Sequence, residues 1–135
     1  MIRYLIAYAV TATVFLAVDM VWLTKVAKQF YYDRLGDLLL TTPRMGAALA
    51  FYALYVVGIV IFAVAPALRE GSAVTAVVYG ALFGLFAYAT YDMTNYATLR
   101  NWSLTVSLVD TVWGTFLTGF AALMGYWVTR IILPG

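Results

Sequence analysis

The sequence contains no cysteine and no histidine, and charged residues make up only 10% of its 135 positions. The two missing residue types exclude disulfide bonds, thiolate metal sites, cysteine nucleophiles and every mechanism that uses an imidazole. An average soluble domain is about 25% charged, so this chain has too few charged side chains to cover a soluble surface. Its net charge of +2 is too small for a nucleic-acid-binding surface, and we expect no nucleic-acid partner.

Several enzyme motifs are also missing. The chain has no P-loop, no G-x-S-x-G and no H-E-x-x-H. Tyr91-Asp92 has no G-x-G-D companion of the kind found in aspartyl intramembrane proteases, and no D-x-x-D pair is present to hold magnesium and a diphosphate. We therefore expect no catalytic residues of a known type, no metal and no cofactor, although the motifs leave enzymatic activity undecided.

Hydrophobic residues make up 65% of the chain, and several apolar runs are long enough to cross a bilayer. They predict an all-α polytopic membrane protein, a single domain over residues 1–135 that forms a bundle of four transmembrane helices. The first run resembles a signal peptide, but it continues past the small-residue site at Ala7-Tyr8-Ala9 and carries Asp19, so we interpret it as a retained helix. The predicted spans are residues 4–26, 44–68, 73–97 and 103–132.

The first connection, residues 27–43, alternates aromatic and charged side chains. This pattern is typical of a short amphipathic element that lies in the membrane interface. Gly36 interrupts the helical pattern, so a plain loop with aromatic anchors is the alternative. Thr41-Thr42-Pro43 predicts the start of the second span, with Pro43 in its first turn.

Small residues recur at every fourth position of the third span. Ala76, Gly80 and Gly84 predict the close approach of a neighbouring helix. Because the same stripe leads to Asp92, we expect that carboxylate to lie against another helix and away from lipid.

Four spans place both termini on one side of the membrane. More lysine and arginine residues lie in or beside the first and third connections than on the opposite side: Lys25, Lys28, Arg34, Arg44 and Arg100 against Arg3, Arg69 and Arg130. This excess favours loops 27–43 and 98–103 in the cytoplasm and both termini outside. The expected location is the inner (plasma) membrane of a bacterium.

Three aspartates lie inside the predicted spans, each near a helix end on the same side of the membrane: Asp19, Asp92 and Asp110. A carboxylate in a spanning helix costs at least about 2.5–3.5 kcal/mol unless it is paired or hydrated. The topology therefore predicts one layer of three acids within one leaflet. Further side chains that can reach this layer complete the candidate ligand- or ion-binding site: Trp22, Tyr91, Thr94, Asn95 and Trp113.

The sequence segments around Asp19 and Asp110 are similar, because each aspartate follows a valine and precedes a tryptophan by three residues. Each tryptophan thus shares a helix face with its acid. The acids can bind a proton or a cation, or pair with Lys25, Arg100 or an indole N–H. The structural alternative is that each acid only holds neighbouring helices together through hydrogen bonds.

Taken together, the phrases Leu16–Leu23, Tyr91–Leu99 with Trp102, and Val109–Thr115 resemble the uncharacterised bacterial membrane family DUF2177. The resemblance covers nearly the whole chain. It implies a small four-helix bacterial membrane protein and brings no established activity.

Three functions remain open on the sequence. The first is a transporter or channel-like element that binds or passes a proton, a small cation or a small solute; four short helices seldom enclose a pathway, so this predicts a homo-oligomer in the lipid bilayer. The second is a membrane-embedded protein or enzyme that binds a lipid or isoprenoid, with the acids in acid–base roles. The third is a structural or accessory membrane subunit.

Overall fold

The computed structural model describes residues 1–39 and 44–134, and these residues form helices and no strand. Four helical stretches are long and apolar enough to cross a membrane: Ile2–Val26, Met45–Glu70, Ala73–Thr98 and Leu104–Ile132. The prediction of an all-α polytopic membrane protein is confirmed. The first and last residues of each predicted span lie within two residues of those observed. The agreement is close because the bilayer requires long uninterrupted apolar helices.

Two of the spans contain a π-helical turn. The first consists of α1 (Ile2–Val21) followed by η1 (Trp22–Val26), and the second of α3 (Met45–Ile59), η3 (Val60–Val64) and α4 (Ala65–Glu70). Pro66 explains the second π turn, because proline lacks an N–H and its ring clashes with the carbonyl four residues earlier, which widens the turn. The span continues through this widened turn without a break.

The third and fourth spans are single helices, α5 (Ala73–Thr98) and α6 (Leu104–Ile132). Serine caps both: Ser72 accepts a hydrogen bond from the backbone N–H of Thr75 at 3.2 Å, and Ser103 accepts one from Val106 at 3.1 Å. Gly71 ends α4 in the left-handed region, with φ 66°, which lets the chain reverse directly into α5.

The first connection forms a short helical element, α2 (Lys28–Leu35) followed by η2 (Gly36–Leu38). A helix, and not a plain loop, therefore follows the first span, while its amphipathic character and its position in the membrane interface stay predictions. Gly36, with φ 50°, ends α2. The predicted helix start at Thr41-Thr42-Pro43 lies outside the described residues, and α3 follows from Met45.

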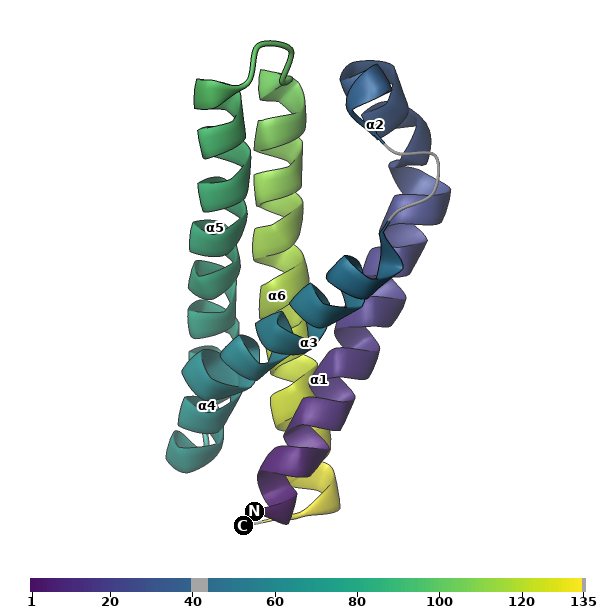
Figure 1. Cartoon of the computed structure of the whole chain (residues 1–135). Coiled ribbons are helices and arrows are strands. Elements are labelled where there is room, and N and C mark those ends of the chain that lie inside the picture. Colours follow the sequence, from purple (N-terminus) through teal and green to yellow (C-terminus); the bar gives the residue numbers. More distant parts are fainter. Residues whose placement is uncertain (40–43, 135) are drawn as a thin grey trace.

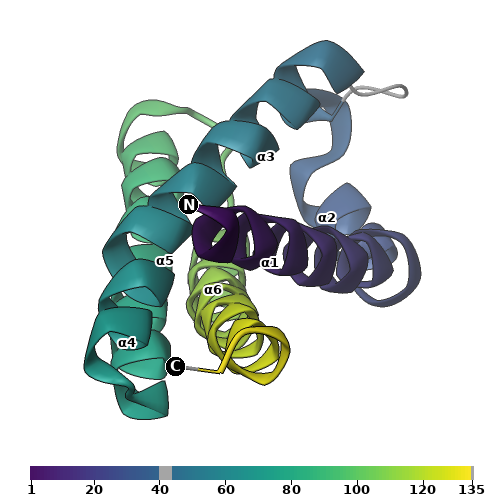
Figure 2. The same cartoon turned by 90° about the horizontal axis from the view of Figure 1, so that it is seen from below.

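The helices pack so that α5 and α6 run antiparallel side by side, α1 leans against α6, and the second span crosses diagonally (Figures 1 and 2). The termini lie together at one end of the bundle, while α2 and the α5–α6 turn lie at the other (Figure 1). The main core cluster draws side chains from every span, including Phe15, Ile59, Ala76 and Leu117.

Helices α5 and α6 pack closely along most of their length. A Cβ atom on Gly80 would lie 2.7 Å from the Cβ atom of Ala122, and one on Gly84 would collide with the main-chain oxygen of Gly114. Ala76, Gly80 and Gly84 are all buried. The small-residue stripe therefore brings the two backbones together, as its spacing predicts.

Candidate functional site

The three intramembrane aspartates lie at similar depth. Asp19 is near the end of the first span, Asp92 near the end of α5 and Asp110 near the start of α6. At 1.5 Å per residue, each lies about 9 to 11 Å from its helix end. All three helix ends are at the end of the bundle that carries α2 (Figure 1).

Asp19 joins three helices. Its side chain is only 5% exposed. Its Oδ2 accepts a hydrogen bond from the hydroxyl of Tyr52 on α3 at 2.7 Å, and its Oδ1 accepts one from Nε1 of Trp113 on α6 at 3.1 Å. Both carboxylate oxygens are therefore satisfied by neutral donors, which offsets the cost of burying the acid.

Asp110 is bound through α2. The hydroxyl of Tyr31 on α2 donates to Oδ1 of Asp110 at 2.9 Å, and the same hydroxyl accepts from Nε1 of Trp22 at 3.0 Å. The Trp22 ring stacks on Trp113, with centroids 4.2 Å apart and planes at 10°. These side-chain contacts connect five residues in series, and we call this series the acid network: Asp19, Trp113, Trp22, Tyr31 and Asp110.

The antiparallel packing of α1 and α6 explains the network. In each helix the tryptophan follows its aspartate by three residues, about 4.5 Å along the axis. Because the helices run in opposite directions, Asp19 reaches the level of Trp113, and Trp22 reaches the level of Asp110. The repeated Asp-x-x-Trp phrase therefore places both indoles face to face between the two acids.

Asp92 differs from the other two acids. It is wholly buried, and its Oδ2 accepts only a long hydrogen bond from Thr111, at 3.4 Å. Its Oδ1 has no hydrogen-bond partner among the described residues. The carboxyl group of Asp110 lies beside it and interacts with it directly. This buried carboxyl thus retains an unused oxygen next to a second acid.

The main chain at Asp92 is hydrogen-bonded to α6, in contrast to its side chain, which makes one long hydrogen bond. Its main-chain oxygen accepts a hydrogen bond from the hydroxyl of Ser107 at 3.0 Å. The same hydroxyl accepts from Nε1 of Trp102 at 2.9 Å. These bonds pin the end of α5 against the start of α6.

Tyr31 remains a neutral donor over the physiological range. Burial raises the pKa of its hydroxyl above the ordinary value of about 10, and the neighbouring Asp110 carboxylate raises it further. A group whose pKa is raised on folding stabilises the folded state below its ordinary pKa and loses that contribution as pH rises through the folded value. Titration of Tyr31 therefore does not alter the docking of α2 below about pH 10.

We expect Tyr31→Phe to lower the free energy of unfolding by about 1 kcal/mol, because it leaves Trp22 Nε1 and Asp110 Oδ1 without their partner. Unfolding in mixed detergent, followed by circular dichroism, measures the loss. Tyr32→Phe is the matched control, since Tyr32 is exposed on the same helix and should change stability little. Equal stabilities of the two variants would contradict the role given to Tyr31.

Five of the eight predicted site residues lie at the acid layer, and three lie away from it. Asp19, Trp22, Asp92, Asp110 and Trp113 lie at the acid layer. Asp92 and Asp110 are neighbours there, but the three acids do not form one group among the described residues, because Asp19 turns to Tyr52 and Trp113. The remaining three face elsewhere: Tyr91 is exposed and packs edge-to-face on Trp102, the exposed Thr94 donates to the backbone oxygen of Thr90, and the half-buried Asn95 lies beside Tyr91.

Sequence patterns alone did not identify Tyr31, Tyr52 and Thr111. The two tyrosines resemble ordinary interface anchors, and Thr111 resembles a small packing residue. The available signal for Tyr52 was that only it and Tyr55 carry hydroxyls among the aliphatic residues of the second span. The expected alternative partners Lys25 and Arg100 are exposed, and the hydrogen bonds that Asp19 accepts among the described residues come from Tyr52 and Trp113.

The acid layer does not have the composition of a metal centre. Among the residues that the structure describes, no three histidine, cysteine or acidic side chains are grouped so that they could hold a metal ion. The chemistry available at this layer is hydrogen bonding and proton binding by carboxyl, phenol and indole groups.

A bundle of four apolar spanning helices with buried carboxyl groups defines a polytopic integral membrane protein. The family model described as "Predicted membrane protein (DUF2177)" matches residues 4–127, and the chain belongs to this family. No curated protein and no solved structure matches the chain.

Proposed function

We propose that this protein handles protons within the bilayer, with the carboxyl pair Asp92–Asp110 as the proton-binding site of a transporter- or channel-like element. The observation that carries the proposal is the unpartnered Oδ1 of the fully buried Asp92 beside the carboxyl of Asp110. One proton shared between the two groups would remove a buried negative charge and supply the missing hydrogen bond.

A proton fits this layer better than a metal cation. A hard cation needs several free oxygen ligands. Here both oxygens of Asp19 and one oxygen of Asp110 already accept hydrogen bonds from N–H or O–H donors. The oxygens left over are enough to hold a proton and too few to surround a cation.

Access to the pair is proposed from the side of α2. Asp110 is half-buried and is bound by Tyr31 of α2. Beyond the acid layer the bundle is filled by apolar side chains such as Phe15, Ile59 and Leu117, so one chain offers a route from one side only. Complete passage would require a homo-oligomer or an opening of the bundle.

The proposed setting is the inner membrane of a bacterium, with loops 27–43 and 98–103 in the cytoplasm and both termini outside. Five basic residues lie in or directly beside these loops and three on the opposite side, and this excess supports the orientation: Lys25, Lys28, Arg34, Arg44 and Arg100 against Arg3, Arg69 and Arg130. The acid pair would then exchange its proton with the cytoplasm.

Proton flux into proteoliposomes tests the function. Vesicles carrying an internal pH-sensitive dye are driven by a potassium diffusion potential with valinomycin. The wild-type protein is expected to conduct protons faster than protein-free vesicles conduct them, and Asp92→Asn and Asp110→Asn should both reduce flux to the protein-free rate, because an amide cannot bind the exchanged proton.

Asp33→Asn is the matched control, because Asp33 is exposed on α2 and bonds to Gln29 outside the acid network. It should conduct like the wild type. Wild-type flux equal to that of protein-free vesicles, or full flux in both Asp92→Asn and Asp110→Asn, would reject the proposal.

A further inference from the structure

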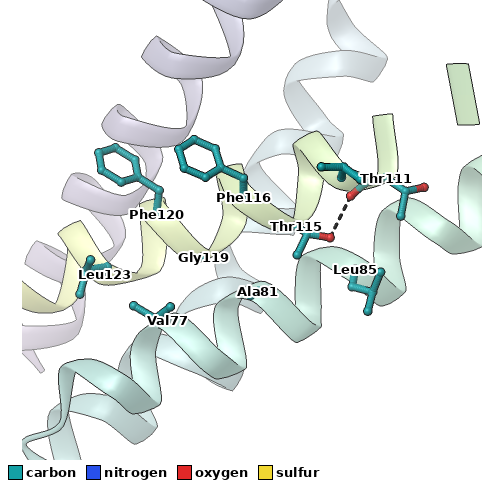
Figure 3. A pocket seen from close by; sticks show the side chains of 10 residues that line it. Val77, Ala81, Leu85, Thr111, Thr115, Phe116, Gly119, Phe120 and Leu123 are labelled. Atoms are coloured by element: carbon teal, nitrogen blue, oxygen red, sulfur yellow. Dashed lines mark hydrogen bonds between the residues drawn. The ribbon is translucent and has the colours of Figure 1, made fainter. Parts of the chain in front are cut away.

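An open groove runs along α5 and α6 on the outer side of the bundle (Figure 3). Its volume is about 560 Å³, within the range of about 300–1,000 Å³ typical of small-molecule sites. Phe116 and Phe120 project from α6 along one wall, and Val77 and Leu85 project from α5 along the other (Figure 3).

The floor of the groove is made by residues with little or no side chain. Gly119 and Ala81 lie between the two walls (Figure 3). A Cβ atom on Gly119 would lie 3.4 Å from that of Ala81, so the two helices touch there and leave the space above the contact open. The groove is therefore built into the α5–α6 packing.

The length of the groove matches one bilayer leaflet. It extends from Thr111 to Leu123 along α6, which is about 18 Å at 1.5 Å per residue. The hydrocarbon core is about 30 Å thick, so one leaflet spans about 15 Å. Helix α6, with 29 residues, is about 44 Å long, so a helix centred on the core extends about 7 Å beyond it at each end. Thr111 lies about 10 Å from the start of α6, which corresponds to a position just inside the core boundary.

Only one end of the groove is polar and continuous with the acid layer. Thr111 lines the groove, and its hydroxyl donates to Asp92. Thr115, one turn further along, turns its hydroxyl back to the main-chain oxygen of Thr111 at 2.8 Å (Figure 3). The rest of the lining is apolar. Such a gradient fits an amphipathic chain whose polar end lies at Thr111.

We propose that this groove binds one acyl chain of a membrane phospholipid, with the ester end at Thr111 and the chain end at Leu123. The bound lipid places its polar end beside the Asp92 side of the acid layer. This site depends on the groove and on Thr111, and it does not depend on proton handling, so each proposal can fail without the other.

Photolabelling in vesicles tests the lipid site. The protein is reconstituted in phosphatidylethanolamine and phosphatidylglycerol that contain a phosphatidylethanolamine with a diazirine on its acyl chain. After irradiation, peptide mass spectrometry should show several-fold more label on Leu85, Phe116 and Phe120 than on Leu54 and Ile61, which are also exposed on a spanning helix.

Filling the groove should remove the excess label. Ala81→Phe places a ring on the floor, while Ala50→Phe adds the same ring at an exposed position of α3 and is the matched control. Val112→Trp narrows the groove from its 70% exposed rim and serves as a second blocking variant that leaves the helix contact intact. Both blocking variants should lower groove labelling to the level of Leu54, and Ala50→Phe should preserve it.

Three results would overturn the proposal. The first is equal labelling of all outward-facing residues, which indicates annular lipid only. The second is unchanged groove labelling in the folded blocking variants. The third is less label on Leu85, Phe116 and Phe120 than on Leu54 and Ile61, which indicates that a second copy of the chain, and not lipid, covers the groove.

Discussion

Gly84→Ala is expected to lower the free energy of unfolding by about 2 kcal/mol, the middle of the range for overpacked sites. The added methyl carbon would collide with the main-chain oxygen of Gly114 and lie 2.7 Å from the Cβ atom of Thr118. Neither obstacle is the tip of a flexible side chain, so α5 and α6 must separate. This steric cost exceeds the roughly 0.5–1 kcal/mol that alanine gains over glycine in a helix.

The matched control for this prediction is Gly46→Ala. A Cβ atom on Gly46 meets nothing within 4 Å, so the substitution should be neutral or slightly stabilising through helix propensity. Both proteins can be unfolded by sodium dodecyl sulfate in mixed micelles and followed by circular dichroism. If Gly84→Ala matched the wild type, or Gly46→Ala lost as much stability, close helix contact would not be what stabilises the α5–α6 pair.

Asp19→Ala is expected to destabilise the bundle by about 2 kcal/mol, because it leaves the Tyr52 hydroxyl and the Trp113 indole N–H unpaired in the interior. Interhelical hydrogen bonds in membranes average only about 0.6 kcal/mol. The larger value follows because two donors lose one shared acceptor and a cavity forms where the carboxyl was.

Asp19→Asn separates hydrogen bonding from charge. The amide oxygen can accept from Trp113, and the amide N–H can donate to the Tyr52 hydroxyl, so we expect stability close to that of the wild type in the same unfolding assay. Comparable losses in Asp19→Asn and Asp19→Ala would show that the negative charge, and not the geometry, holds the three helices together.

The Asp19→Asn variant also tests whether Asp19 has a different role from Asp92 and Asp110. Under the proposed function, Asp19 holds helices together through hydrogen bonds, and the pair Asp92–Asp110 binds the proton. Asp19→Asn should therefore retain proton flux in vesicles in which Asp92→Asn has lost it. Loss of flux in both variants, with both proteins folded, would move Asp19 into the proton-binding site.

The spans and the depth of the acids could be predicted from the sequence with little error. The reason is the solvent: in a bilayer, any backbone that crosses must form a long apolar helix, so length and composition locate each span. Once the spans are known, alternating direction places the ends of the first and third helices and the start of the fourth on one side. Asp19, Asp92 and Asp110 must then share a layer.

Proximity along the chain predicted the partners of Asp92 poorly. Tyr91 and Thr94 are its near neighbours in sequence, yet both are exposed, because a helix turns by about 100° per residue and points adjacent side chains in different directions. The side chains that contact it, Thr111 and Asp110, come from the next helix.

The sequence by itself therefore determined the class of protein, the four spans and the shared depth of three acids within them. Only the tertiary structure decided that Tyr52 binds Asp19, that Tyr31 binds Asp110, and that Trp22 stacks on Trp113. It also decided that Oδ1 of Asp92 has no hydrogen-bond partner within residues 1–39 and 44–134. Hydropathy and helix period are local properties of the chain. The rotation of each helix about its axis and the position of α2 depend on packing between distant segments, which local patterns do not encode.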